Sequence, residues 1–222
     1  MRDGGPHILQ LDNEKSLICK TLIIAVGCLP RWLGIPSEKT FYGKGVSACA
    51  YCDGPFYRGT PVCVVGGGDT AMEDALLLAD TAGKVYLIHR RDKFRATKIL
   101  QDKVLANPAI KIYYNHTVEE ILGSDFVERI RIRDLKSGKE EILNCSAYFS
   151  ALGYFPNTAV FQNVLELDEQ GYICTRNDST QCSCAGVFAA GDCADPAYRQ
   201  AVTAAGSGCR AAIDAARFLM QQ

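Results

Sequence analysis

The sequence has no long apolar segment and no excess of charge of either sign. No apolar run approaches the roughly 20 residues that a membrane-spanning helix needs, and the segment Met1–His7 lacks the apolar core of a secretory signal. The 24 basic and 25 acidic residues leave a net charge of −1, so nothing in the charge balance points to nucleic acid or to an anionic membrane. We therefore predict a cytoplasmic protein with no nucleic-acid or membrane partner.

Internal repeats and low-complexity tracts are also absent, whereas cysteine is abundant. The 11 cysteines are an odd number at irregular spacing, in a chain of 222 residues that suits one or two domains with a sizeable core. This pattern is unlike the disulfide framework of a small secreted protein. Most of the cysteines are therefore expected to be reduced and to act as small, buried apolar residues.

The middle of the chain alternates between strand and helix patterns. Strands at 62–65, 84–88 and 110–114 and helices at 69–82 and 95–106 follow one another, which implies right-handed crossovers and a parallel sheet. The short segments 110–114, 118–122, 129–133 and 141–143 often alternate between apolar and polar residues, which suggests an antiparallel appendage. The apolar segment 147–152 is expected to close this domain.

Two further buried strands are expected outside this region. Residues 21–26 form a continuous apolar run, typical of a strand buried on both faces of a sheet, and Gly27 and Pro30 follow it. A second apolar run stops at Gly191 and Asp192, before an Ala-rich helical pattern at 199–220. Ligands bind at the carboxyl ends of strands in open α/β folds, so Asp192 is a candidate to bind a sugar hydroxyl.

A glycine turn follows the first strand of the alternating region. It has the pattern Gly-x-Gly-x-x-Ala between a strand and a helix, with a second strand about 20 residues later. Such a turn places a dinucleotide pyrophosphate at a helix N-terminus. The cofactor-binding residues predicted here are Gly66, Gly67, Gly68, Asp69, Thr70 and Ala71.

The end of the second strand carries positive charge. His89, Arg90 and Arg91 stand where a carboxylate would bind the ribose 2′-hydroxyl of NADH, and Arg95 follows. Guanidinium groups bind a 2′-phosphate bidentately, whereas a carboxylate would repel it. A solvated basic face is the alternative, but cations oppose the helix dipole at a helix N-terminus. These four residues predict NADPH rather than NADH as the cofactor.

Cys49 and Cys52 are separated by two residues and precede the glycine turn. Such a pair can close a small disulfide at the start of a helix, where the helix dipole lowers a thiolate pKa. Half of a structural zinc site or two incidental core thiols are the alternatives. Zinc would need a second pair, and the candidates Cys182, Cys184 and Cys193 have an unusual spacing for it. We therefore favour a redox disulfide and no metal, and expect the last three cysteines to pack in the core.

These motifs, in this order and spacing, resemble the low-molecular-weight bacterial-type thioredoxin reductases. The resemblance rests on Cys-Ala-Tyr-Cys-Asp-Gly, Gly-Gly-Gly-Asp-Thr-Ala, His-Arg-Arg-Asp-Lys-Phe-Arg-Ala, Phe-Ala-Ala-Gly-Asp and Tyr-Arg-Gln-Ala, which cover nearly the whole chain. It implies an α/β fold of the two-dinucleotide-binding-domain flavoprotein type. A Rossmann-like NADPH-binding domain at 31–156, with the redox motif, would be inserted in a partial FAD-binding domain at 1–30 and 157–222.

The resemblance also implies a thioredoxin-disulfide reductase activity and a homodimer. In the family, hydride passes from NADPH to FAD, and electrons pass on to the disulfide and to thioredoxin, while the two domains rotate. Carried over by position, Cys52 would face the flavin, Cys49 would attack the partner disulfide, and Asp53 would act as the acid or base. The residues that would contact FAD are Gly191, Asp192, Arg199, Gln200 and Ala201.

One part of the family pattern does not occur in the sequence. The first FAD segment, with its own Gly-x-Gly-x-x-Gly turn, is missing, so we expect an N-terminally truncated member whose FAD binding is weakened. The alternatives are an NADPH-binding module without catalysis and a reductase of a different disulfide protein.

Overall fold

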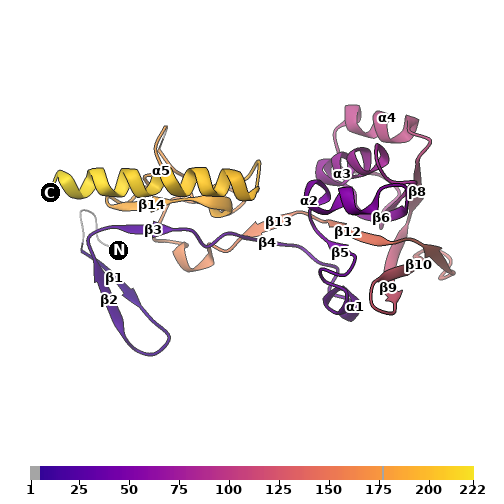
Figure 1. Cartoon of the computed structure of the whole chain (residues 1–222), viewed down its shortest axis with the longest axis horizontal. Coiled ribbons are helices and arrows are strands. Elements are labelled where there is room, and N and C mark those ends of the chain that lie inside the picture. The colour runs from indigo at the N-terminus through magenta and orange to yellow at the C-terminus, as the bar shows by residue number, and fades with distance from the viewer. Residues whose placement is uncertain (1–5, 177) are drawn as a thin grey trace. The chain divides into compact units, whose positions relative to one another are not determined.

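The computed structural model describes residues 6–176 and 178–222. Contacts divide the chain into two compact units, and each is described by itself (Figure 1). Pro30–Gly153 form the central unit, while the residues up to Leu29 and Tyr154–Gln222 form the flanking unit. The flanking unit is thus interrupted in sequence by the central one.

A five-stranded parallel sheet forms the middle layer of the central unit. All of β12 and most of β6 are buried, because other elements cover both faces of the sheet. The predicted parallel sheet is confirmed, and β8 belongs to it rather than to the antiparallel appendage. In spatial order the strands are β5 (Val46–Ser47), β12 (Ala147–Ala151), β6 (Pro61–Gly66), β7 (Lys84–His89) and β8 (Ile110–Tyr114).

Helices cover one face of this sheet. Helix α3 buries Ala71, Ala75 and Leu78, which are spaced three or four residues apart, against apolar side chains of β6 and β12. The helices and the 3₁₀ turn of this unit are α1 (Pro36–Thr40), α2 (Ala50–Asp53), η1 (Gly54–Tyr57), α3 (Asp69–Ala79) and α4 (Lys98–Ala106).

The start of α4 differs from the prediction. The sequence suggested a helix from Arg95, but α4 begins at Lys98, with Thr97 as its N-cap. The backbone N–H of Arg95 donates to the carbonyl oxygen of Gly67 instead, at 2.8 Å. This long-range hydrogen bond holds the chain before Thr97 as a loop against the glycine turn, so the helix begins later.

An antiparallel sheet covers the other face of the parallel sheet. Its strands are β9 (His116–Gly123), β10 (Val127–Asp134) and β11 (Glu140–Asn144), with β10 in the middle. Ile130 and Ile132 of β10 are fully buried against side chains of the parallel sheet, whereas Arg129 and Arg133 point to solvent. This alternation is what the sequence pattern predicted, and the appendage is confirmed for these three strands.

The flanking unit consists of short strands and one long helix. Strand β3 (Leu22–Ile24) pairs in parallel with β14 (Val187–Ala189), and α5 (Ala201–Met220) packs on β14 through Ala211 and Ala215. The other elements are the hairpin of β1 (His7–Gln10) and β2 (Ser16–Cys19), the pair β4 (Cys28–Pro30) and β13 (Tyr154–Pro156), and the 3₁₀ turns η2 (Ala159–Phe161) and η3 (Gly191–Cys193). Within residues 6–176 and 178–222, no helix combines the length and apolar character of a membrane span.

Candidate active site

The glycine turn leaves no room for side chains at its first two positions. Gly66 ends β6, and Gly68 is the N-cap of α3. A Cβ on Gly66 would lie 2.4 Å from the carbonyl oxygen of Ala151, and a Cβ on Gly67 would lie 2.2 Å from the ring of His89. Because both positions exclude a side chain, the strand can pass directly into the N-terminus of α3, as dinucleotide binding requires.

Residues 90–97, called here the arginine loop, lie against this turn. In addition to the bond between Arg95 and the turn, the backbone N–H of Thr97 donates to the carboxylate of Asp69 at 2.6 Å. Asp69 is the first residue of α3. The side chains of Arg90, Arg91 and Arg95 are exposed. The structure thus places these three guanidinium-bearing residues on a loop that is tied to the turn.

The remaining members of the predicted nucleotide site are less exposed. Thr70 is half-buried and Ala71 is buried, both in the first turn of α3. His89 is also buried, and its two ring nitrogens lie 2.9 Å from the carbonyl oxygens of Gly66 and Lys93. His89 therefore lies between the turn and the arginine loop.

Cys49 and Cys52 form a disulfide at the start of α2, with their Cα atoms 5.3 Å apart. Cys49 is the N-cap, and the backbone N–H of Cys52 donates to its Sγ at 3.2 Å. Ser47 orients the entry to the helix, because its hydroxyl accepts the N–H of Cys49 at 3.0 Å. The sulfurs are bonded to each other, as the redox interpretation predicted. Across the described ranges, no group of three or more His, Cys, Asp and Glu side chains is arranged to hold a metal.

Helix α2, which carries the disulfide, packs on α3, the helix that follows the glycine turn. Ala50 of α2 lies in the same buried cluster as Ala71 and Ala75 of α3. The contact continues past the end of α2, where a Cβ on Gly54 would lie 2.9 Å from Leu78. The two motifs that are adjacent in the sequence are therefore also in contact in the fold, within one unit (Figure 1).

Asp53 ends α2 and is half-buried. Burial, and to a lesser extent the charge of Asp53, raise the pKa of Tyr57 above its ordinary value. Tyr57 packs edge-on against Phe149 of β12, with ring centroids 5.9 Å apart. The carboxylate of Asp53 thus lies where the disulfide helix meets the core of the central unit.

The predicted flavin contacts gather in the flanking unit. Asp192 follows β14, and the thiol of Cys28 in β4 lies 3.7 Å from its carboxylate. The N–H of Gly191 donates to the hydroxyl of Ser207 in α5 at 2.9 Å, which brings η3 against the start of this helix. Burial, followed by the charge and the hydrogen bond of Asp192, raises the pKa of Cys28 to about 11.

The start of α5 carries the other three predicted flavin contacts. Gln200 is the N-cap and Ala201 the first helical residue, and Gln200 forms a reciprocal capping box with Thr203. Arg199 has a left-handed backbone, with φ of 50°, and its guanidinium lies 4.9 Å from the ring centroid of Tyr154. Two of the predicted residues, Arg199 and Gln200, thus contribute to the shape of the helix N-terminus.

Two residues of this region, Cys28 and Asp195, were not identified from the sequence. Cys28 begins β4, just after the carboxyl end of β3, and β3 pairs with β14, which Asp192 follows. The position of Cys28 after the apolar run at 21–26 was the available signal. Asp195 accepts the backbone N–H groups of Ala197 and Tyr198 at 2.9 Å each. Burial opposes the ionisation of Asp195, but these hydrogen bonds outweigh it and lower its pKa. Asp195 thereby shapes the turn that leads into α5.

The other singled-out cysteines are packing residues. Cys182 and Cys193 are fully buried in an apolar cluster with Ile24 and Val187, and Cys184 packs against it. Burial raises the pKa of Cys182 to about 12. The expectation of core packing is confirmed for Cys182 and Cys193, whereas Cys184 is partly buried at the edge of this cluster.

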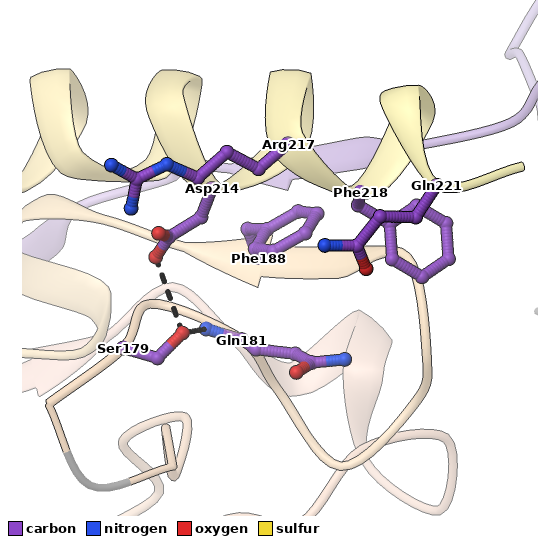
Figure 2. Close-up of a pocket in the computed structure, with 7 residues that line it drawn as sticks. All are labelled: Ser179, Gln181, Phe188, Asp214, Arg217, Phe218 and Gln221. Atoms are coloured by element: carbon purple, nitrogen blue, oxygen red, sulfur yellow. Dashed lines mark hydrogen bonds between the residues drawn. The ribbon is translucent and has the colours of Figure 1, made fainter.

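A small pocket of the flanking unit lies apart from these residues. It has a volume of about 180 Å³ beside α5 and β14, with Phe188 and Phe218 on its apolar side (Figure 2). Asp214 in its wall accepts hydrogen bonds from Ser179 and Thr180. None of the residues that line it belongs to the predicted site.

A glycine turn between a strand and a helix, in contact with a Cys-x-x-Cys disulfide, is the arrangement expected of a nucleotide-linked disulfide oxidoreductase. The sequence profile described as "Pyridine nucleotide-disulphide oxidoreductase" matches residues 3–208. A thioredoxin reductase of Escherichia coli O157:H7 is 51% identical over 224 residues, which cover 96% of this chain and 69% of that protein. The chain belongs to the pyridine nucleotide-disulphide oxidoreductase family, within its thioredoxin reductases.

Two further comparisons agree with this assignment. A thioredoxin reductase of Rickettsia felis is 48% identical over 203 residues, which cover 90% of this chain and 66% of that protein. The structure of thioredoxin reductase from Giardia duodenalis superposes with a TM-score of 0.90 at 44% identity, over 97% of this chain and 71% of that one. The chain spans about two thirds of the length of the relatives it matches.

Proposed function

We propose that the chain carries electrons from NADPH to the disulfide of a partner, which is thioredoxin or a thioredoxin-like protein. The observation that carries this proposal is the Cys49–Cys52 disulfide on α2, which packs against α3, the helix of the glycine turn. Both groups lie in the central unit. The names of the relatives, thioredoxin reductases, support the same partner.

NADPH is the proposed electron donor. The glycine turn, residues 66–71, would hold its pyrophosphate at the N-terminus of α3. Arg90, Arg91 and Arg95 would hold its 2′-phosphate by charge-assisted hydrogen bonds. Their exposure on a loop that is hydrogen-bonded to the turn supports this assignment, and it makes the central unit the NADPH-binding domain.

FAD is the proposed second cofactor, and its chemistry when bound would be to relay two electrons between NADPH and the disulfide. Asp192 would accept a hydrogen bond from a sugar hydroxyl, and Gly191 with the start of α5, residues 199–201, would line the same site. These residues fit the sugar part of the group. A turn of the Gly-x-Gly-x-x-Ala pattern that joins a strand to a helix occurs once in the described residues, and we assign it to NADPH because the arginine loop lies against it. The flanking unit would thus be a partial FAD-binding domain.

The dithiol would reduce its partner by exchange. Two electrons and two protons first convert the Cys49–Cys52 disulfide into two thiols. One thiolate attacks the partner disulfide, which forms an intermolecular disulfide and releases one partner thiol. The other thiolate attacks this bond, restores the Cys49–Cys52 disulfide and releases the second partner thiol. Asp53, next to Cys52, would exchange the protons.

The exposure of the two cysteine residues bears on which thiol attacks first. Cys52 is exposed, whereas Cys49 is half-buried at the N-cap of α2. An incoming protein disulfide must align with the attacking sulfur, so exposure favours Cys52. This order is the reverse of the one that the family resemblance implies, and we propose it on the basis of the geometry.

Trapping the intermolecular disulfide tests both the proposed function and the order in which the two thiols react. The variants Cys49→Ser and Cys52→Ser would each be mixed with a thioredoxin whose one remaining active-site cysteine carries a small aromatic thiol as leaving group. We expect a covalent complex with both, formed faster by Cys49→Ser, which retains Cys52. The double variant measures the background of the nine other cysteines. No complex above this background would contradict the proposed function.

An NADPH-binding module without turnover is the second candidate function. The single glycine turn favours it, because a second nucleotide would lack its usual pyrophosphate site. A chain that binds NADPH but gives no trapped complex would support this module.

The resemblance extends the first proposal to a homodimer in the cytoplasm, and sedimentation equilibrium would test the dimer.

A further inference from the structure

His89 joins the two parts of the proposed nucleotide site. It is the last residue of β7 and is 6% exposed. Its Nδ1 lies 2.9 Å from the carbonyl oxygen of Gly66, where the glycine turn begins, and its Nε2 lies 2.9 Å from that of Lys93, in the arginine loop. Each ring nitrogen therefore faces a main-chain carbonyl oxygen, which can only accept, so a neutral ring donates to one of the two oxygens and a doubly protonated ring to both. With an oxygen at each nitrogen, neither nitrogen is left to bind a phosphate.

The ring is also fixed by its packing. It lies against Phe94, with ring centroids 5.0 Å apart, and Phe94 lies against Tyr114 of β8 at 4.9 Å. Gly67 also lies close to the ring and leaves no room for a side chain, because a Cβ there would lie 2.2 Å from the Cε1 atom of His89. A ring that lies between two carbonyl oxygens, donates to at least one of them and packs against Phe94 and Gly67 sets the distance between the elements that it joins.

We infer that His89 is a positioning residue, which holds the arginine loop at a fixed distance from the glycine turn and does not contact the 2′-phosphate. This inference rests on the proposed NADPH site and assigns His89 a role different from that of the arginines beside it. The turn would bind the pyrophosphate, which NADPH and NADH share, whereas the arginines would bind the 2′-phosphate, which NADPH alone carries. A positioning residue that supports both parts should affect both cofactors.

The two roles predict different patterns of affinity. If His89 positions the site, His89→Phe, which keeps a ring but has no N–H to donate to either carbonyl oxygen, should weaken NADPH and NADH by similar factors of about five- to tenfold. The matched variant Arg90→Ala with Arg91→Ala should weaken NADPH mainly, which brings the two affinities together. Calorimetric titration of each cofactor into each variant measures the ratio directly.

Two controls separate positioning from a general loss of stability. Val104→Ala removes a fully buried side chain from α4, outside the site, and should lower the unfolding temperature without changing either affinity. Amide hydrogen exchange supplies a readout without ligand. The N–H of Arg95, which donates to Gly67, should exchange faster in His89→Phe than in wild type, and should stay protected in the arginine variant.

A second substitution keeps the test valid if His89→Phe fails to fold. His89→Gln retains an amide donor that can reach one of the two carbonyl oxygens, so it should show a smaller loss that is again equal for the two cofactors. Loss of NADPH affinity alone, with NADH unchanged, would overturn the inference in favour of direct phosphate contact. Unchanged affinity for both cofactors would overturn it as well. A wild-type chain that binds neither cofactor would instead refute the NADPH proposal.

Discussion

At the scale of single residues, Asp74 is a buried acid on the helix that follows the glycine turn. It lies on α3 with 8% of its surface exposed. Burial, and to a smaller extent the charge of Glu73, raise the pKa of its carboxyl from 3.8 to about 7. The folded protein therefore holds a proton on Asp74 at pH values where the unfolded chain has lost it.

This shift predicts a stability that falls as the pH rises. Between the ordinary pKa of 3.8 and the folded value of about 7, the folded state binds more protons than the unfolded state. The contribution of Asp74 is therefore full below the lower value and is lost as the pH passes the upper one. Asp74→Asn should remove this slope and raise the free energy of unfolding near pH 8 by about 1–4 kcal/mol.

Denaturant unfolding near pH 5 and near pH 8 measures this prediction. The control is Asp80→Asn, at the exposed C-cap of the same helix, which should leave the pH dependence as in wild type. If Asp74→Asn and wild type lose stability equally between the two pH values, the carboxyl of Asp74 does not titrate in this range.

At the scale of elements, the glycine turn is where strand, helix and arginine loop meet. Its three glycines are not equivalent. A Cβ on Gly66 would meet the backbone of β12 at 2.4 Å, whereas a Cβ on Gly68 would have no atom within 4 Å. The backbone of a central strand cannot easily move aside, so the first position tolerates no side chain while the third is open.

We expect Gly66→Ala and Gly68→Ala to differ in stability. Gly66→Ala forces β6 and β12 apart and should cost about 1–3 kcal/mol, as overpacking in a core does. Gly68→Ala adds the same methyl group in open space and serves as the matched control, with a change within about 0.5 kcal/mol. Thermal unfolding of the two proteins without ligand provides the comparison, and equal unfolding temperatures would contradict it.

Local patterns predicted the elements well, but not the contacts that join them. Apolar runs and alternation predicted β6 to β12 of the central unit, because burial on one or both faces gives a strand a recognisable pattern of apolar residues. The two-residue strand β5 was not predicted. The late start of α4 depends on a hydrogen bond from Arg95 to Gly67, and the contact of Cys28 with Asp192 joins residues 164 positions apart. His89 belonged to a basic cluster in the sequence, and only the fold shows that its ring points inward. Contacts between residues that are far apart in the sequence leave no periodic pattern from which they could be predicted.

At the scale of the whole molecule, the proposed sites are divided between the two units. The disulfide, the glycine turn and the arginine loop lie in the central unit, and the proposed flavin contacts lie in the flanking unit. Affinity for a ligand as large as FAD depends on many pre-organised contacts. Asp192 and the start of α5 would supply such contacts for part of the FAD molecule.

A protein of these 222 residues is therefore expected to bind NADPH and to purify without bound flavin. The visible absorbance of the purified protein, followed by titration with FAD, measures this expectation. A yellow protein with one FAD per chain would show that the residues 191–201 and their neighbours suffice for the whole ligand.

The central claim is that Cys49 and Cys52 act as one two-electron redox couple. Equilibrating the protein in buffers of graded thiol and disulfide content, then alkylating and mapping by mass spectrometry, tests it most directly. We predict that Cys49 and Cys52 become labelled together, at one buffer composition, while the labelling of the nine other cysteines shows no such shared transition. Labelling of Cys49 and Cys52 at different buffer compositions, or protection of both by zinc, would contradict the account.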